Sequence, residues 1–114
     1  MARYTVKQVA QMARISIRAL HHYDQIGLLK PAHTGENGYR YYGREELLRL
    51  QQILIHRALD IPLAEIGAIL DDPGFDRLTA LESQRTRVAE QADRLASMLR
   101  TIDRTIAELK GDRA

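Results

Sequence analysis

The sequence predicts a mainly α-helical fold that carries one small β-hairpin. Two short amphipathic segments, separated by a brief turn, occupy residues 5–26 and are typical of paired helices. An Asn-Gly dipeptide near the centre of residues 33–42 indicates a hairpin. From 78 to 109 a seam then recurs every three or four positions, apolar except at Arg85, as in a coiled coil. We therefore expect a winged helix-turn-helix domain followed by a long C-terminal helix that forms a coiled-coil dimer.

The first helix is predicted to begin after Thr5. Thr5 and Gln8 have the spacing of a capping box, in which each side chain bonds the other residue's free backbone N–H group. Val6, Val9 and Ala10 then fall on one helical face. Ala13 continues the same face one turn further on.

The second helix is predicted to begin after Ser16, whose hydroxyl suits an N-cap. Gly27 lies where a left-handed residue would end this helix. Positions one turn apart along it are Ile17, Leu20 and Tyr23 or Asp24. Two short helices joined by about four residues make a helix-turn-helix, and the second helix of that motif can enter the major groove of DNA.

The exposed face of the second helix is predicted to contact DNA. The candidate residues on it are Ser16, Arg18, His21, His22 and Tyr23. Arg18 lies near the helix start, where a guanidinium can bond guanine O6 and N7 together. A phosphate contact or an ion pair with Asp24 is an equal alternative for Arg18. His22 and Tyr23 are expected to contact sugar and phosphate.

A metal site at His21 and His22 is not expected. Adjacent residues of a helix point about 100° apart, whereas helical metal ligands are normally four residues apart. We expect no metal ion and no other cofactor.

Residues 33–42 are predicted to form a wing that holds the phosphate backbone. Its Asn-Gly pair predicts a type I′ turn, in which both central residues adopt positive φ. In the strand that follows, Tyr39 and Tyr41 share one side and Arg40 takes the other. Tyr41 and Tyr42 suit the core and a DNA contact equally, since one hairpin face must be buried. The DNA contacts predicted here are Lys30, Tyr39, Arg40 and Tyr41, with Arg3, Lys7 and Arg14 as weaker candidates.

Residues 44–72 predict a second helix pair. An apolar face is formed by Leu47, Leu50, Leu54 and Ala58, and Leu48 and Ile55 broaden it. Pro62 opens the next helix, whose inward residues are Leu63, Ile66, Ile69 and Leu70. The short segment Arg3–Thr5 can add a strand to the wing.

The C-terminal seam predicts dimerisation. Its residues include Val88, Ala92, Leu95, Leu99, Ile102, Ile106 and Leu109. The alternative is a helix folded back on the N-terminal domain, but a seam this narrow is poorly suited to a globular core. An antiparallel pair would separate the two reading heads, so that they reach major-groove faces about 34 Å apart. The predicted parts are residues 1–74 for the DNA-binding domain, 75–110 for the coiled coil and 111–114 for a tail.

Composition narrows the class of protein. The chain has no cysteine, which excludes disulfides and cysteine-ligated metal sites. Residues 1–59 contain nine Lys or Arg and four Asp or Glu, whereas residues 60–114 contain eight and eleven. The basic half is the one with the helix-turn-helix, as expected for nucleic-acid binding. No signal peptide, membrane span or catalytic group of residues is recognisable, so we expect a cytoplasmic protein that is not an enzyme.

Several motifs in this order resemble the MerR-type transcriptional regulators, and within them the TipA- and SkgA-like subgroup. The matching segments are residues 4–6, 16–24, 26–29, 37–42, 45–50 and 63–66. The sequence departs from the family at His21, where Arg is frequent, and at Pro62, where Ser or Thr is common. Loss of the cap at Pro62 leaves the geometry of that corner open.

The resemblance implies an antiparallel homodimer that binds an inverted repeat in promoter DNA. It further implies that the dimer distorts the spacer between the promoter elements for RNA polymerase and so activates transcription. Family members usually carry an effector-binding domain after the coil. This chain is either the DNA-binding region of a longer regulator or a regulator without that domain, and the effector is unknown. Alternatives are a coiled-coil adaptor, a repressor and an architectural DNA binder.

Overall fold

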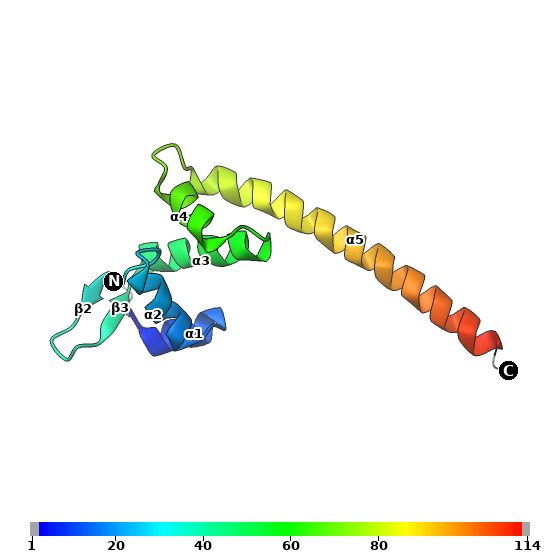
Figure 1. Ribbon diagram of the computed structural model, residues 1–114, viewed down its shortest axis with the longest axis horizontal. Helices are drawn as coiled ribbons and strands as arrows, with labels where there is room; N and C mark the ends of the chain where they lie inside the picture. Colours follow the sequence, from blue (N-terminus) through cyan, green and yellow to red (C-terminus); the bar gives the residue numbers. More distant parts are fainter. Residues whose placement is uncertain (1–2, 113–114) are drawn as a thin grey trace. The chain divides into compact units, whose positions relative to one another are not determined.

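The computed structural model describes residues 3–112 and divides into two compact units. The N-terminal unit runs to Pro73 and the C-terminal unit begins at Gly74. The first contains helices α1–α4 and strands β1–β3, and the second is built on helix α5 (Figure 1). The predicted mainly helical fold with one small sheet is confirmed. Among residues 3–112, every helix falls short of the apolar length that a bilayer crossing requires.

Helices α1 (Val6–Ala13) and α2 (Ile17–Gln25) form the helix-turn-helix. The capping box at α1 is present, because the Thr5 N–H donates to Gln8 Oε1 at 2.9 Å and the Gln8 N–H donates to Thr5 Oγ1 at 3.2 Å. Ser16 caps α2, and its Oγ accepts the Ala19 N–H at 2.9 Å. Both helix starts are therefore fixed by side chains that the sequence identifies.

The end of α2 depends on Gly27, whose φ is +76°. The Leu28 N–H donates to the Tyr23 carbonyl at 2.8 Å, and the Gly27 N–H donates to the Asp24 carbonyl at 3.1 Å. This pair of bonds is the Schellman motif. It turns the chain so that Leu28 and Leu29 enter the core.

Three short strands form an antiparallel sheet in the order β1–β3–β2. Their bounds are Tyr4–Thr5 for β1, His33–Thr34 for β2 and Arg40–Tyr42 for β3. Strand β1 adds to the wing hairpin, as the sequence suggested. Because β1 leads directly into α1, the central strand β3 ties the wing to the start of the helix-turn-helix.

The hairpin turn differs from the predicted type I′ turn. Gly38 has a φ of +81°, but Asn37 is not among the described residues with positive φ. The Gly38 N–H donates to the Gly35 carbonyl at 2.9 Å, and the Gly35 N–H donates to the Tyr39 carbonyl at 2.8 Å. This is a three-residue loop in which a type I turn precedes a left-handed glycine. Asn37 Oδ1 accepts the Tyr39 N–H at 3.0 Å, which occupies the Asn side chain without a positive φ.

Helices α3 (Arg44–Ala58) and α4 (Leu63–Asp71) form the second helix pair. The predicted apolar face of α3 was partly wrong, because Ile53 is fully buried whereas Ala58 is exposed. Helix α3 packs against both α4 and β3, so its buried arc is broader than one stripe. Pro62 precedes α4 without a side-chain cap, as expected from its lack of a hydroxyl.

Helix α5 (Arg77–Asp112) is uninterrupted (Figure 1). The carboxylate of Asp76 accepts bonds from the hydroxyl and the backbone N–H of Thr79, and these bonds hold the pKa of Asp76 below its usual value. The prediction of a separate tail from residue 111 was wrong at its start, since α5 continues to Asp112. The last two residues of that predicted tail lie outside the described range.

Replacing Arg14 by Gly is expected to stabilise the protein. Arg14 ends α1 with a φ of +57°, a conformation that costs a side-chain-bearing residue roughly 1–2 kcal/mol. Glycine loses more entropy on folding, by about 0.4–1 kcal/mol. We expect the free energy of unfolding, measured with urea, to rise by roughly 0.5–1 kcal/mol. Gln11→Gly, inside the same helix, is the control and should lose about 1 kcal/mol. Equal losses in both variants would contradict this account of Arg14.

Candidate nucleic-acid interface

Helix α2 presents one polar face. Arg18, His21 and His22 are spaced three and four residues apart and therefore share this face. Arg18 and His22 are exposed, and His21 is half-buried. Ser16 is exposed at the helix start, where its hydroxyl is still able to donate a hydrogen bond. These four residues lie where the sequence predicted them.

Tyr23 does not lie on that face, and its prediction as a DNA contact was wrong. Its side chain is only 1% exposed, and its hydroxyl accepts a bond from Arg57 Nη1 at 2.8 Å. Tyr23 lies one turn after Leu20, which is fully buried, so both side chains point to the same side of α2. The spacing in the sequence already allowed this core position.

The wing supplies a second set of side chains. Tyr39 is 62% exposed near the turn, and Arg40 and Tyr41 are half-buried in strand β3. The Tyr41 ring stacks on His33 of the facing strand, with ring centres 6.2 Å apart. Tyr42 is fully buried, so of the two residues that the sequence left open, Tyr42 belongs to the core.

An open groove joins the wing to the helix-turn-helix. Its lining comes from the start of α1, from α2 and from the wing, namely Thr5, Val6, Lys7, His21, Gly38, Tyr39 and Arg40. Lys7 was only a weak candidate in the sequence, because a single lysine on a helix is usually just solvated. The pairing of β1 with β3 brings it to the same groove as Arg40. The groove therefore combines cationic and hydrogen-bonding side chains from three elements.

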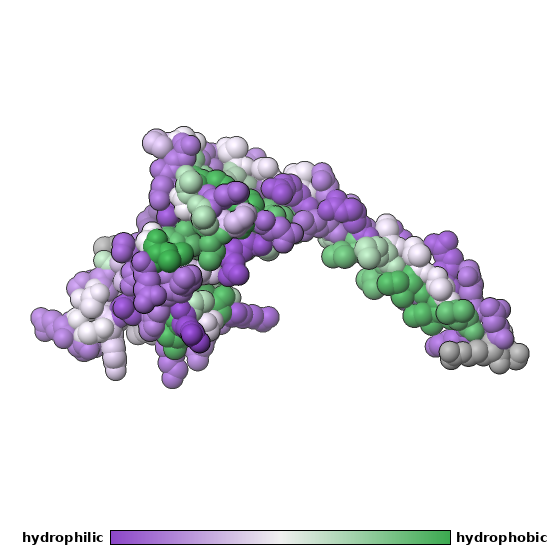
Figure 2. Space-filling model, viewed as in Figure 1, coloured by the Kyte–Doolittle hydropathy of each residue, from purple (hydrophilic) through white to green (hydrophobic). Residues whose placement is uncertain are grey.

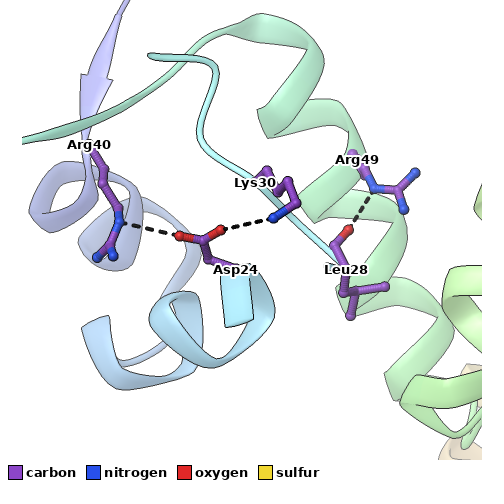
Figure 3. A network of polar contacts seen from close by, with 5 residues as sticks. All are labelled: Asp24, Leu28, Lys30, Arg40 and Arg49. Carbon is purple, nitrogen blue, oxygen red and sulfur yellow. Dashed lines mark hydrogen bonds and ion pairs between the residues drawn. The ribbon is translucent and has the colours of Figure 1, made fainter. Parts of the chain in front are cut away.

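Asp24 is the centre of a small ionic network at the end of α2 (Figure 3). Its Oδ2 lies 3.3 Å from Arg40 Nε, and its Oδ1 lies 3.7 Å from Lys30 Nζ. An ion pair between Arg18 and Asp24 was one of the alternatives that the sequence left open. The partners in the structure come instead from the wing and from the connector that leads to it.

Two arginines of α3 donate hydrogen bonds to α2 and to the residues that follow it. Arg49 Nε donates to the Leu28 carbonyl at 2.7 Å (Figure 3). Its Nη2 pairs with Asp71 at 3.0 Å. Arg57 donates to the hydroxyl of Tyr23, as described above. Sequence periodicity could not identify these roles, because each bond joins residues that lie far apart along the chain.

The pKa of the Tyr42 hydroxyl is raised above its ordinary value. Burial is the main cause that raises the pKa of its hydroxyl, and the charge of Asp24 raises it further, while the charge of Arg40 lowers it. Within residues 3–112 the hydroxyl is buried without a hydrogen-bond partner. Among the same residues, no three His, Asp or Glu side chains gather as a metal site would require.

The apolar seam of α5 is a second candidate surface. Leu95 and Leu99 are 59% and 60% exposed, and Ile102, Ile106 and Leu109 are between 45% and 56% exposed. Figure 2 shows hydrophobic side chains in a band along much of this helix. Val88 and Ala92 are exposed too, and Met98 adds an apolar side chain that the predicted seam did not include.

Known proteins with similar sequences are transcriptional regulators. Residues 4–72 match the family described as MerR HTH family regulatory protein. The regulator SkgA of Caulobacter vibrioides is 61% identical over 112 residues, which cover 98% of this chain and 44% of SkgA. The activator TipA of Streptomyces coelicolor is 41% identical over 103 residues, which cover 90% of this chain and 41% of TipA. The chain thus spans less than half the length of these relatives.

Two solved structures extend the likeness. The crystal structure of SkgA from Caulobacter crescentus has a TM-score of 0.84 and 60% identity, and the match covers 100% of this chain and 82% of that one. HiNmlR, a MerR family regulator lacking the sensor domain and bound to promoter DNA, has a TM-score of 0.68 and 26% identity, with 93% and 89% covered. The family match includes every helix and strand of the N-terminal unit, and the likeness to SkgA continues through α5. With its helix-turn-helix, wing and long C-terminal helix, the chain belongs to the MerR family of helix-turn-helix regulators.

Proposed function

We propose that this chain is a transcriptional regulator that binds promoter DNA as a homodimer. The observation that carries the proposal is the groove in which Lys7, His21 and Arg40 converge from α1, α2 and the wing. A recognition helix flanked by such a groove can read bases in the major groove while the wing holds the neighbouring phosphates.

The charge of this region supports DNA as the partner. Residues 3–42 contain six Lys or Arg and two acidic residues. One of those acidic residues, Asp24, is half-buried and paired with two cations. Release of counterions by such cations drives binding to duplex DNA and makes it depend on salt.

The relatives support a regulator in particular. HiNmlR lacks a sensor domain and is bound to promoter DNA, and its chain matches nearly the whole of this one. By that likeness, residues 3–112 contain the elements that a DNA-binding regulator needs. The adaptor alternative has less support, because the polar face of α2 and the wing arginine are both in place.

Dimerisation through α5 is supported by its exposed seam. Burying large apolar side chains favours association by about 25 cal/mol for each Å² removed from water, before the cost of lost translational and rotational freedom is subtracted. We propose an antiparallel coiled coil, because it separates the two heads for major-groove faces about 34 Å apart. Such a dimer would read an inverted repeat.

For regulation we propose activation by distortion of the promoter spacer. Bending DNA over such a site costs of order 1–6 kcal/mol, which wing and helix contacts of both heads would offset. RNA polymerase would then engage the realigned promoter elements in the bacterial cytoplasm. The name of TipA as an activator supports this direction.

Selection of bound sequences from random duplexes tests the proposed function. An enriched inverted repeat is expected, and its half-site and spacing would report the separation of the heads. A footprint then shows whether the site lies in a promoter spacer. Binding that is independent of salt, or the absence of any enriched sequence, would refute sequence-specific DNA binding.

Arg40→Ala is expected to weaken binding to all duplexes by a similar factor, because Arg40 is assigned to phosphate rather than to a base. The slope of log affinity against log salt should fall by about one unit for each head. Gel shifts between 50 and 200 mM salt, a range in which phosphate contacts change affinity strongly, measure this slope. Arg94→Ala on α5 is the matched control. A weaker affinity with an unchanged slope would exclude the phosphate contact.

Leu99→Asp places a charge in the centre of the seam, where it would lose its hydration in a dimer. We expect monomers in sedimentation and loss of binding to the inverted repeat. The N-terminal unit should stay folded, since Leu99 lies outside its core. Unchanged amide NMR signals of that unit would show this. A stable dimer of this variant would show that the apolar seam of α5 is not the dimer interface.

A further inference from the structure

We propose that Asp24 is a positioning residue that holds Arg40 of the wing in the orientation that binds DNA phosphate. The inference rests on the DNA-binding function proposed above and adds a role for the one acidic residue of α2. A carboxylate on a DNA-facing element repels phosphate, so charge alone would favour its removal. The geometry instead predicts that removing the charge of Asp24 weakens DNA binding.

The Arg40–Asp24 pair is partly protected from water. The side chain of Asp24 is 20% exposed and that of Arg40 is 39% exposed, with 3.3 Å between Nε and Oδ2. The contact is an ion pair through Nε, and arginine has five N–H donors in all. Figure 3 shows the contact with Asp24 through Nε, and no dashed line leads from the two terminal nitrogens of Arg40. Arg40 can therefore bond a carboxylate and a phosphate at the same time.

Lys30 has a different relation to Asp24. Its ammonium lies 3.7 Å from Oδ1, and its side chain is 71% exposed. Exposed pairs of this kind hold a flexible side chain only weakly. Lys30 is thus free to turn towards DNA, whereas Arg40 is the cation that Asp24 orients.

The surroundings strengthen the Arg40 pair. Tyr42 lies two residues after Arg40 in β3 and is fully buried. Residues two apart in a strand share a face, so Arg40 and Tyr42 lie on the same side of β3. A low-dielectric neighbour increases the attraction between the two charges. Strand β3 and the end of α2 are therefore linked by a contact that water screens only in part.

The test is Asp24→Asn, which removes the charge and keeps the shape. The matched control is Glu90→Gln, which changes the net charge equally on the exposed outer face of α5. If Asp24 positions Arg40, Asp24→Asn should bind the selected duplex about three- to tenfold more weakly, because Arg40 must then be ordered on binding. The salt slope should stay as in the unmodified protein, because Arg40 still makes its phosphate contact once it is ordered. Glu90→Gln should bind as the unmodified protein does.

A double variant separates positioning from general damage. Once Arg40 is Ala, adding Asp24→Asn should weaken binding no further, because the group that Asp24 orients is gone. A melting curve of each variant reports whether the fold is intact. Equal or tighter binding by Asp24→Asn, or the same loss in both backgrounds, would overturn the inference.

The Arg40 Nε–H signal in nitrogen-edited NMR provides a readout without DNA. We expect the chemical shift of this signal to change in Asp24→Asn, because the charge beside Nε is then gone. A signal that is unchanged by the substitution would refute the positioning role even where DNA binds. If the unmodified protein bound no duplex while this signal behaved as expected, the DNA-binding function would fail and the Asp24–Arg40 orientation would stand.

Discussion

The burial of the inner face of α2 is the interaction on which the candidate interface depends. Leu20 and Tyr23 are almost wholly removed from water and pack in one core with Val9, Tyr42 and Ile53. Each such side chain contributes about 1.5–3 kcal/mol when fully buried. Since a helix cannot rotate without exposing its inner face, this packing decides which side chains face outwards. The polar face of α2 is therefore a consequence of the core.

Polar contacts at the edges of that core fix the position of α2 more closely. Arg49 bonds the carbonyl of Leu28 just after the helix, and Arg57 bonds the hydroxyl of Tyr23. On the other side, Asp24 reaches the wing through Arg40. Both sides of the helix are thus joined to elements that are distant in sequence. Such links suit the proposed function, in which this domain holds its shape against deformed DNA.

The C-terminal unit poses a separate physical problem. A small helical chain buries little apolar area by itself, and α5 leaves most of its seam exposed. A second copy of the same helix would cover that seam with matching side chains. Association and DNA recognition are therefore expected to be linked, since two heads bind an inverted repeat far better than one.

The sequence by itself determined the elements whose causes are local. Thr5, Ser16 and Gly27 set helix ends through bonds within a few residues, and the seam spacing indicated a long helix, which the structure contains. Only the tertiary structure decided that Tyr23 is buried and that the turn at Asn37 is not type I′. It also brought Lys7 and Arg40 to one groove and paired Arg40 with Asp24. These outcomes depend on which distant surfaces meet, and helical or strand periodicity carries no information about that choice.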